Sequence, residues 1–217
     1  MKQRVKVALI DYGASNLHSV YKALQRSGAE VMIATDPGEV EKADALVLPG
    51  QGHFRQVMEA FLASGFEGVV RAHIAAEKPF LGICVGLQLL MNGSEEAPGV
   101  PGLSLLPGTV KRFPAGVSVP QMGWNQIFKT GDPELLGGIP NGAFAYFANS
   151  YYVEFEGESV PGATTEYGGV RFKSAVSAGQ LYATQFHPEK SQAVGLKVLA
   201  NFCALASSTR PAPSAKA

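Results

Sequence analysis

The stretch PFLGICVGLQLL, residues 79–90, decides the fold prediction and also contains the best candidate nucleophile. An apolar run suited to a buried strand ends at Cys84, and a helix is expected from Val85 to Met91. Gly82 and Gly86 lie two residues on either side of the cysteine, where Cβ atoms would collide on a sharp turn. This is the pattern of a nucleophile elbow, with cysteine in place of serine.

The expected turn also favours thiolate chemistry. The start of the following helix presents unpaired N–H groups and the positive end of its dipole to the sulfur. The N–H of Val85 is suited to donate to an oxyanion. An inert, buried Cys84 between two convenient glycines fits the segment as well. Cys203, in the last predicted helix, has no such setting and is interpreted as a core residue.

Strand and helix signals alternate in the first half of the chain. Apolar runs at residues 5–10, 29–34, 45–48 and 79–83 predict strands with helices between them. This order predicts an α/β fold with a mostly parallel, open, flavodoxin-like sheet flanked by helices. From residue 110 to 184, short aromatic and β-branched runs between glycines and prolines predict an antiparallel extension. Helices are expected near residues 17–24, 53–62, 67–76, 85–91 and 191–205.

Length and charge limit the possible classes of protein. The 217 residues suggest a single domain, expected over residues 1–206, with a disordered tail over residues 207–217. The 18 basic and 18 acidic residues give no net charge, which argues against nucleic-acid binding.

Membrane and metal signals are weak. The longest uncharged run, residues 135–153, is interrupted by glycine, proline and asparagine, so no membrane span is expected. The apolar stretch after the basic start ends at Asp11 and is too short for a signal peptide, so none is expected. Two distant cysteines indicate neither a disulfide framework nor a zinc site. We therefore expect a cytoplasmic protein without metal or other cofactor.

A cysteine nucleophile needs a proton partner, and His187 is the best candidate. Pro188 favours an extended His187, so Glu189, two residues after the histidine, points to the same side and can orient the imidazole. A plain surface loop fits the same three residues. The other histidines are His18 and His73, within helical patterns, and His53, beside a glycine loop.

Two further features suit the same site. Gly50, Gln51 and Gly52 follow a predicted strand, and ligand sites form where parallel strands end. The N–H groups of this loop are candidates for an oxyanion hole, although a plain turn fits too, and a phosphate loop would need a Lys-Ser/Thr pair. Gln88 lies about one helical turn after Cys84, where it faces a polar substrate or serves only as a helix former.

Together, residues 79–90 and His187-Pro188-Glu189 resemble the class I (triad-type) glutamine amidotransferases, over about residues 6–205. The resemblance implies that Cys84 attacks the side-chain amide of L-glutamine and forms a glutamyl thioester. It implies that His187 protonates the leaving ammonia and then activates water, and that Glu189 orients His187. By the same resemblance, Gln88 helps to hold the substrate.

Flanking motifs resemble the branch of this family that serves histidine biosynthesis. They are DYGASNLHSV (11–20), VPQMGWN (119–125) and YFANSYYV (146–153). In that branch the glutaminase forms a heterodimer with a (β/α)8-barrel cyclase, which receives the ammonia and makes imidazole glycerol phosphate and an aminoimidazole carboxamide ribotide. The last motif implies substrate contacts for Asn149, Ser150 and Tyr151.

Three residues are candidates for contact with the cyclase. Trp124 is either a core aromatic residue or an exposed interface anchor, and the resemblance favours the anchor. Asn16 and Lys190 are further interface candidates.

The chain departs from the family pattern at three positions. Gln121 and Asn149 stand where histidine is more frequent, and Gln51 stands where valine is. None belongs to the triad, but Gln51 and Asn149 are expected near the substrate. We hypothesise that a flip of the loop peptide at Gly50-Gln51-Gly52 supplies an oxyanion donor when the cyclase binds its ligand.

Other functions fit part of the sequence. A glutaminase of purine, tryptophan or vitamin B6 synthesis would share the triad without the motif Met122-Gly123-Trp124-Asn125. A cysteine peptidase or hydratase on a related sheet would prefer other substrates. An assembly subunit with a degenerate site would need no intact triad.

Overall fold

The computed structural model describes residues 4–13, 17–156 and 160–209. In chain order the strands are β1 (Lys6–Ile10), β2 (Glu30–Ala34), β3 (Ala45–Gly50), β4 (Phe80–Cys84), β5 (Gly108–Arg112), β6 (Gln121–Thr130), β7 (Ala143–Asn149), β8 (Tyr151–Phe155), β9 (Gly162–Tyr167), β10 (Val170–Ala178) and β11 (Leu181–Thr184). The α-helices are α1 (Leu17–Arg26), α2 (Phe54–Ala63), α3 (Phe66–Ala75), α4 (Val85–Leu89) and α5 (Gln192–Ser208). Short 3-10 helices are η1 (Pro37–Lys42), η2 (Glu134–Leu136) and η3 (Pro188–Lys190).

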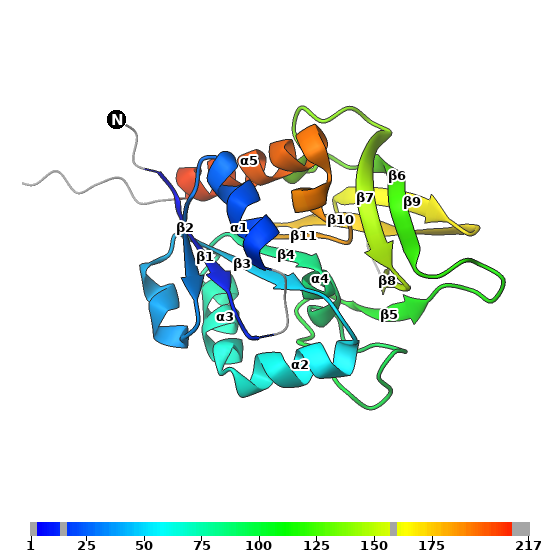
Figure 1. Cartoon of the computed structure of the whole chain (residues 1–217), viewed down its shortest axis with the longest axis horizontal. Helices are drawn as coiled ribbons and strands as arrows, with labels where there is room; N and C mark the ends of the chain where they lie inside the picture. Colours follow the sequence, from blue (N-terminus) through cyan, green and yellow to red (C-terminus); the bar gives the residue numbers. More distant parts are fainter. Residues whose placement is uncertain (1–3, 14–16, 157–159, 210–217) are drawn as a thin grey trace, which may run out of the picture.

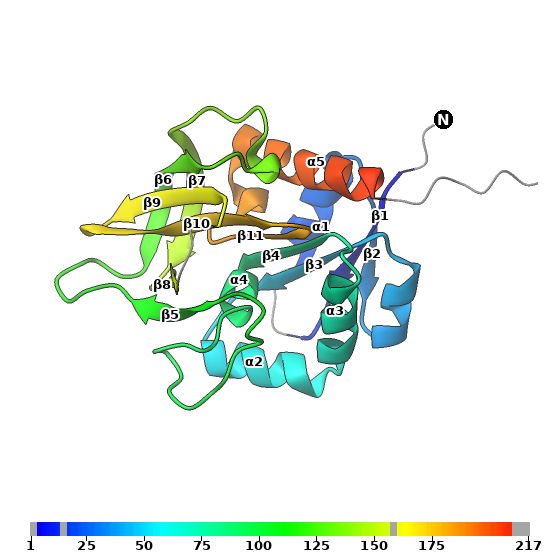
Figure 2. The same cartoon turned by 180° about the vertical axis from the view of Figure 1, so that it is seen from behind.

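The sheet has the strand order β2-β1-β3-β4-β11-β10-β9-β6-β7, with β8 paired to β10 and β5. The pairs from β2 to β11 are parallel, whereas β11 and β10 begin an antiparallel part. Helices α1 and α5 cover one face of the parallel part, and α2 and α3 cover the other (Figures 1 and 2). The predicted α/β fold, with a parallel sheet between helices and an antiparallel extension, is therefore confirmed, and the sheet as a whole is mixed.

The apolar runs explain why the parallel strands lie in the centre. Every residue of β3 and β4 is buried, as are four of the five residues of β1. Such runs suit strands that have helices on both faces, because no side of the strand meets water. The predicted and observed strands agree to within two residues at their ends.

The antiparallel part contains strands that the sequence pattern did not indicate. β6 alternates between buried Gln121 and Ile127 on one face and exposed Met122 and Trp124 on the other. Its outward face is apolar, so the usual polar–apolar alternation is missing. β9 consists of small and polar residues, which carry a weak strand signal.

Two helix predictions needed correction at their ends. α4 ends at Leu89 rather than Met91, because the chain turns at Leu90. α5 continues through Ser208, so the first two residues assigned to the tail, Ser207 and Ser208, are helical. Residues 210–217 and the predicted interface residue Asn16 lie outside the described residues. Among the described helices, none combines the length and hydropathy required to span a bilayer.

Strand order places the candidate nucleophile at the centre of the sheet's carboxyl edge. Cys84 ends β4 and pairs in register with Gly50, which ends the neighbouring β3. On the other side, Thr184 of β11 pairs with Ile83, so Gln185 follows beside Cys84. The fold thus brings residues about a hundred positions apart to one point.

Candidate active site

Cys84 lies on a strained turn between β4 and α4, with φ 56° and ψ −109°. Positive φ is costly for a residue with a side chain, so the surroundings must enforce it. Added Cβ atoms would approach backbone oxygens to 2.9 Å for Gly82, against Gly86, and to 2.0 Å for Gly86, against Leu48. The glycines are required by this close backbone packing, and the predicted elbow is present.

His187 and Glu189 form a buried pair beside the cysteine. Nδ1 of His187 lies 2.8 Å from Oε1 of Glu189, and both side chains are less than a tenth exposed. The backbone N–H of His187 donates to the carbonyl of Tyr146 on β7 at 2.9 Å, and Ser191 Oγ donates to the carbonyl of His187 at 2.7 Å. The histidine is therefore fixed at the junction between η3 and the antiparallel strands.

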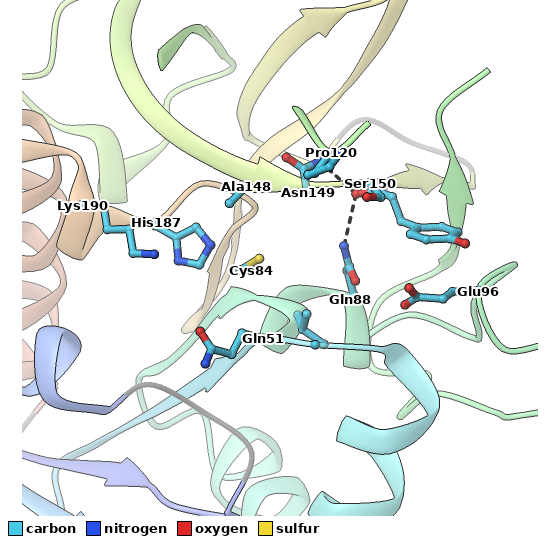
Figure 3. Close-up of a pocket in the computed structure, with 13 residues that line it drawn as sticks. Gln51, Cys84, Gln88, Glu96, Pro120, Ala148, Asn149, Ser150, His187 and Lys190 are labelled. Atoms are coloured by element: carbon cyan, nitrogen blue, oxygen red, sulfur yellow. Dashed lines mark hydrogen bonds between the residues drawn. The ribbon is translucent and has the colours of Figure 1, made fainter. Parts of the chain in front are cut away.

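The electrostatics favour a charged imidazole. Burial lowers the pKa of His187, but the sulfur of Cys84 and the carboxylate of Glu189 outweigh it and raise the pKa to about 10. Because Nδ1 faces Glu189, Nε2 remains for the sulfur, and Figure 3 shows the ring turned toward Cys84. This arrangement places a charged imidazole beside the sulfur of Cys84.

A cavity of about 200 Å³ opens in front of Cys84 and His187 (Figure 3). Its walls come from the loop after β3, the elbow and α4, the end of β7 with the β7–β8 turn, the segment from His187 to η3, and two residues outside these elements, Glu96 and Pro120. The lining residues are Gln51, Gly52, Cys84, Val85, Gln88, Glu96, Pro120, Ala148, Asn149, Ser150, Tyr151, His187 and Lys190. Gly50 lies beside Cys84 at the end of β3, and Glu189 lies behind His187.

Side-chain amides form one wall of this cavity. Nε2 of Gln88 donates to the carbonyl of Tyr151 at 3.2 Å, and Nδ2 of Asn149 donates to the same carbonyl at 2.9 Å. Glu96 lies at the end of the view in Figure 3 away from His187, and its Oε2 accepts the N–H of Phe54 at 2.8 Å. The sequence reasoning did not single out Glu96, which lies in an irregular segment without any motif.

Two of the predicted interface residues, Trp124 and Lys190, lie near the cavity. Trp124 is 46% exposed on the outer face of β6, where its ring and that of Tyr146 are nearly perpendicular, with a centroid distance of 6.0 Å. The ammonium of Lys190 lies 5.9 Å from the centroid of the Tyr146 ring. Of the two interpretations of Trp124, the exposed side chain fits the observed position and the core residue does not.

The remaining histidines have other surroundings. His53 precedes α2, and its Nδ1 accepts the N–H of Arg55 at 3.2 Å. His73 is buried, with Nε2 3.0 Å from the carbonyl of Pro79. Within the described part of the chain, no group of three or more His, Cys, Asp or Glu residues is arranged to hold a metal ion.

Comparison with known proteins identifies the family. Residues 8–205 match the model of the "Glutamine amidotransferase class-I" family. The chain belongs to this family. The chain is 55% identical to imidazole glycerol phosphate synthase subunit HisH of Deinococcus radiodurans, over 91% of this chain and 92% of that protein. It is 53% identical to the HisH subunit of Thermus thermophilus, over 91% of this chain and 95% of that protein.

A solved structure shows the same fold at low sequence similarity. PurLQS from Thermotoga maritima matches with a TM-score of 0.74 at 16% identity, over 94% of this chain and 99% of the matched chain. This likeness concerns the fold alone. The class I amidotransferase fold is thus shared with a protein of very different sequence.

In this amidotransferase, the three unusual residues occupy different places. Gln51 is exposed at the cavity mouth, whereas Asn149 is buried in its wall. Gln121 pairs in register with Asn149 and is buried behind it. Among the described atoms, neither polar end of the Gln121 amide nor Oδ1 of Asn149 has a hydrogen-bond partner.

Proposed function

We propose that this class I amidotransferase is the glutaminase subunit of imidazole glycerol phosphate synthase. It hydrolyses L-glutamine to glutamate and ammonia, and it delivers the ammonia to a (β/α)8-barrel cyclase within a heterodimer. The cyclase makes imidazole glycerol phosphate and an aminoimidazole carboxamide ribotide in histidine biosynthesis. The single observation that carries the chemistry is the line of groups from Cys84 to His187 to Glu189, and the HisH relatives support the pathway.

The triad accounts for both halves of the hydrolysis. The Cys84 thiolate attacks the amide carbon of glutamine, and the proton of the His187 imidazolium passes to the nitrogen as the C–N bond breaks. Ammonia leaves, and a glutamyl thioester remains on the sulfur. Neutral His187 then removes a proton from water, whose oxygen attacks the thioester. The C–S bond breaks, glutamate leaves, and the original ion pair is restored.

Glu189 holds the histidine in the tautomer and orientation that this sequence requires. Its carboxylate accepts a hydrogen bond from the Nδ1–H of His187, which keeps Nε2 toward the sulfur throughout. Both side chains are buried, so water does not compete for this hydrogen bond. The pair thereby stabilises the positive charge on the imidazole before ammonia leaves.

The oxyanion of each tetrahedral intermediate needs donors in front of Cys84. The N–H of Val85 directly follows the nucleophile, and Gln51 and Gly52 line the opposite side of the cavity. Gly50 is packed against the elbow, where its own Cβ would lie 2.8 Å from the backbone N of Gly86. We assign the oxyanion donors to Val85 and to the loop at Gly50-Gln51-Gly52.

The amide wall orients the amino-acid end of glutamine. Both protons of Gln88 Nε2 are engaged, by the Tyr151 carbonyl and by Gln185 Oε1, so the free Gln88 Oε1 is an acceptor for the substrate ammonium. Glu96 adds a carboxylate near this end. Ser150 and Tyr151 complete this wall of the cavity.

The outer face of β6 and β7 is suited to bind the cyclase. It displays exposed Met122, Trp124 and Phe144, with exposed fractions of 68, 46 and 54%. In the strand register Met122 lies opposite Ala148, which lines the cavity. A contiguous apolar face next to a reaction cavity is typical of an interaction surface.

Glutamate release from L-glutamine tests the proposal. The purified chain is assayed alone, with a cognate cyclase, and with the cyclase plus its nucleotide ligand, and Cys84→Ala is the matched control. We expect strong stimulation by the liganded cyclase and no activity in the control. Glutaminase activity without stimulation would indicate another amidotransferase pathway, and cleavage of peptides in place of glutamine would indicate a peptidase.

A further inference from the structure

Gln185 connects the two functional groups on either side of it. Its side chain is completely buried between Cys84 and Gln88. Nε2 of Gln185 lies 3.7 Å from the sulfur of Cys84, within hydrogen-bonding range for sulfur, and Oε1 lies 3.2 Å from Nε2 of Gln88. The hydrolysis described above uses only the oxygen of this amide, through Gln88, and not the N–H that faces the sulfur.

The hydrogen-bond network fixes which way the Gln185 amide points. Gln88 must present its NH2 group to the carbonyl of Tyr151, because a backbone carbonyl only accepts. The second N–H of that group then donates to Gln185, which must accept the hydrogen bond through Oε1. The NH2 group of Gln185 is therefore left to donate to the sulfur of Cys84.

The backbone holds Gln185 in this place. It directly follows β11, whose Thr184 pairs with Ile83 beside the nucleophile. Its N–H donates to the carbonyl of Ser174 on β10 at 2.9 Å. Two residues later comes His187, so one short segment supplies contacts to both the sulfur and its proton partner.

We propose that Gln185 is a positioning residue that holds the Cys84 thiolate with its amide N–H and the substrate-binding Gln88 with its amide oxygen. Hydrogen bonds to an ionised group are about twice as strong as neutral ones, so the N–H stabilises the thiolate more than the thiol. The oxygen fixes the Gln88 amide, so that Oε1 of Gln88 faces the ligand. The second function rests on the proposed glutaminase activity, whereas the first does not.

Two variants separate these functions. Gln185→Met has a similar length and neither donates nor accepts a strong hydrogen bond. Gln185→Glu is nearly isosteric and keeps an acceptor for Gln88, but it replaces the donor to the sulfur by a second oxygen. Gln180→Met is the matched control, because Gln180 lies on the β10–β11 turn, at the opposite end of β11 from Gln185.

The readout is the rate of Cys84 alkylation by iodoacetamide as a function of pH, measured on the free chain without glutamine or cyclase. Cys84→Ala identifies the signal of Cys203. We expect the acid limb of the profile to move to higher pH by about one unit in Gln185→Met and further in Gln185→Glu, because an ionic hydrogen bond to the thiolate is lost. Gln180→Met should reproduce the original profile.

Steady-state kinetics with the liganded cyclase test the contact with Gln88. Gln185→Met should raise KM for glutamine about tenfold, because Gln88 is no longer fixed. Gln185→Glu should change KM less and kcat more, because it keeps the acceptor and disturbs the nucleophile.

Three outcomes would overturn the proposal. One is an alkylation profile in both folded variants that superimposes on the original. Another is an equal fall in activity in both variants without any movement of the profile. Loss of folding in both variants would also contradict it, since Gln185 would then support the fold and not the sulfur. Because alkylation needs no glutamine, these outcomes are distinct from a failure of the glutaminase assay.

Discussion

The parallel part of the sheet buries the apolar residues of its central strands, whereas the antiparallel part exposes some of its apolar residues on one face. β3 and β4 are buried throughout and end at the elbow, whereas β6 and β7 bury one face and expose aromatic and methionine side chains on the other. Close backbone packing around Gly82 and Gly86 holds the nucleophile in a strained conformation in the parallel part. The antiparallel part has an exposed apolar face on β6 and β7, and the end of β7 lines the cavity in front of Cys84.

His187, the proposed proton partner of Cys84, follows the strand at which the parallel and antiparallel parts of the sheet meet. β11 pairs in parallel with β4 and antiparallel with β10, and His187 follows it within a few residues. The backbone of His187 is bonded to β7, and its ring faces Cys84. A partner that binds the outer face of β6 and β7 would therefore contact the strand to which the backbone of His187 is bonded.

The largest loss of activity is expected when the pair of His187 and Glu189 is disrupted. Glu189→Gln removes the charge that orients His187, and we expect kcat to fall by roughly 10³–10⁴-fold. Glutamate release measured with the liganded cyclase checks this. A fall of less than tenfold, in a chain that melts at the original temperature, would show that the buried pair is structural.

A smaller but still large effect is expected at the end of β3, on the parallel side of the cavity. In Gln51→Pro the loop loses an N–H, so the stimulated glutaminase activity should decrease by about 10²–10³-fold if this N–H completes the oxyanion hole. Unchanged stimulation in this variant would rule out the peptide-flip hypothesis. Gln51→Ala keeps the N–H and serves as the control.

Two truncations test whether the outer face of β6, and not the exposed edge at β2, binds the cyclase. Trp124→Ala on β6 should weaken binding to the cyclase about 30-fold or more, as for a hot-spot residue, without cooperative loss of folding. Ile33→Ala on β2, where the side chain is 42% exposed, should leave the affinity unchanged. Titration calorimetry and thermal melting check both variants.

If Trp124→Ala unfolded the chain and did not merely weaken the complex, the interpretation of Trp124 as an interface residue would be wrong. If Trp124→Ala lost its cooperative transition, the tryptophan would belong to the core of the antiparallel part. Equal losses of affinity in Trp124→Ala and Ile33→Ala would remove the proposed difference between the two faces.

The smallest effect concerns the stability of the parallel part in acid. Burial, with a small contribution from Lys78, lowers the pKa of His73 to about 4 despite its contact with the Pro79 carbonyl. Between about pH 6.5 and pH 4 the unfolded chain binds this proton and the folded chain does not, so stability falls as the pH decreases through that range. We expect His73 to account for roughly 1 to 2 kcal/mol of this loss.

Urea unfolding at pH 7.5 and pH 4.5 measures this contribution. His73→Gln removes the titrating group, so its free energy of unfolding should depend less on pH than that of the original chain. An identical pH dependence in both chains would assign the acid sensitivity to other groups.

The sequence pattern predicted the parallel part well because its strands are buried on both faces and form uninterrupted apolar runs. The elbow was equally predictable, since the glycines around Cys84 have a steric cause that acts over a few residues. The antiparallel part was harder, because β6 carries apolar residues on a face that is exposed in the isolated chain, and β9 carries few.

The site was predictable where a local pattern marks it and not where only the fold creates it. His187 is extended, as Pro188 predicts, but Glu189 belongs to the 3-10 helix η3, so the two side chains meet across a tight turn and the extended segment predicted for Glu189 was wrong. Glu96 and Gln185 reach the site through a loop and through the β11–β4 pairing, and neither contact leaves a signal in the spacing of residues.

The central claim is that Cys84 is the nucleophile of a glutaminase, and trapping its intermediate tests this most directly. The liganded complex is mixed with glutamine and quenched in acid, and the digested chain is mapped by mass spectrometry, with Cys203 as the internal control. We predict a glutamyl group on the peptide that contains Cys84 and none on the peptide that contains Cys203. Release of glutamate without any adduct at Cys84, or an adduct at Cys203, would contradict the account.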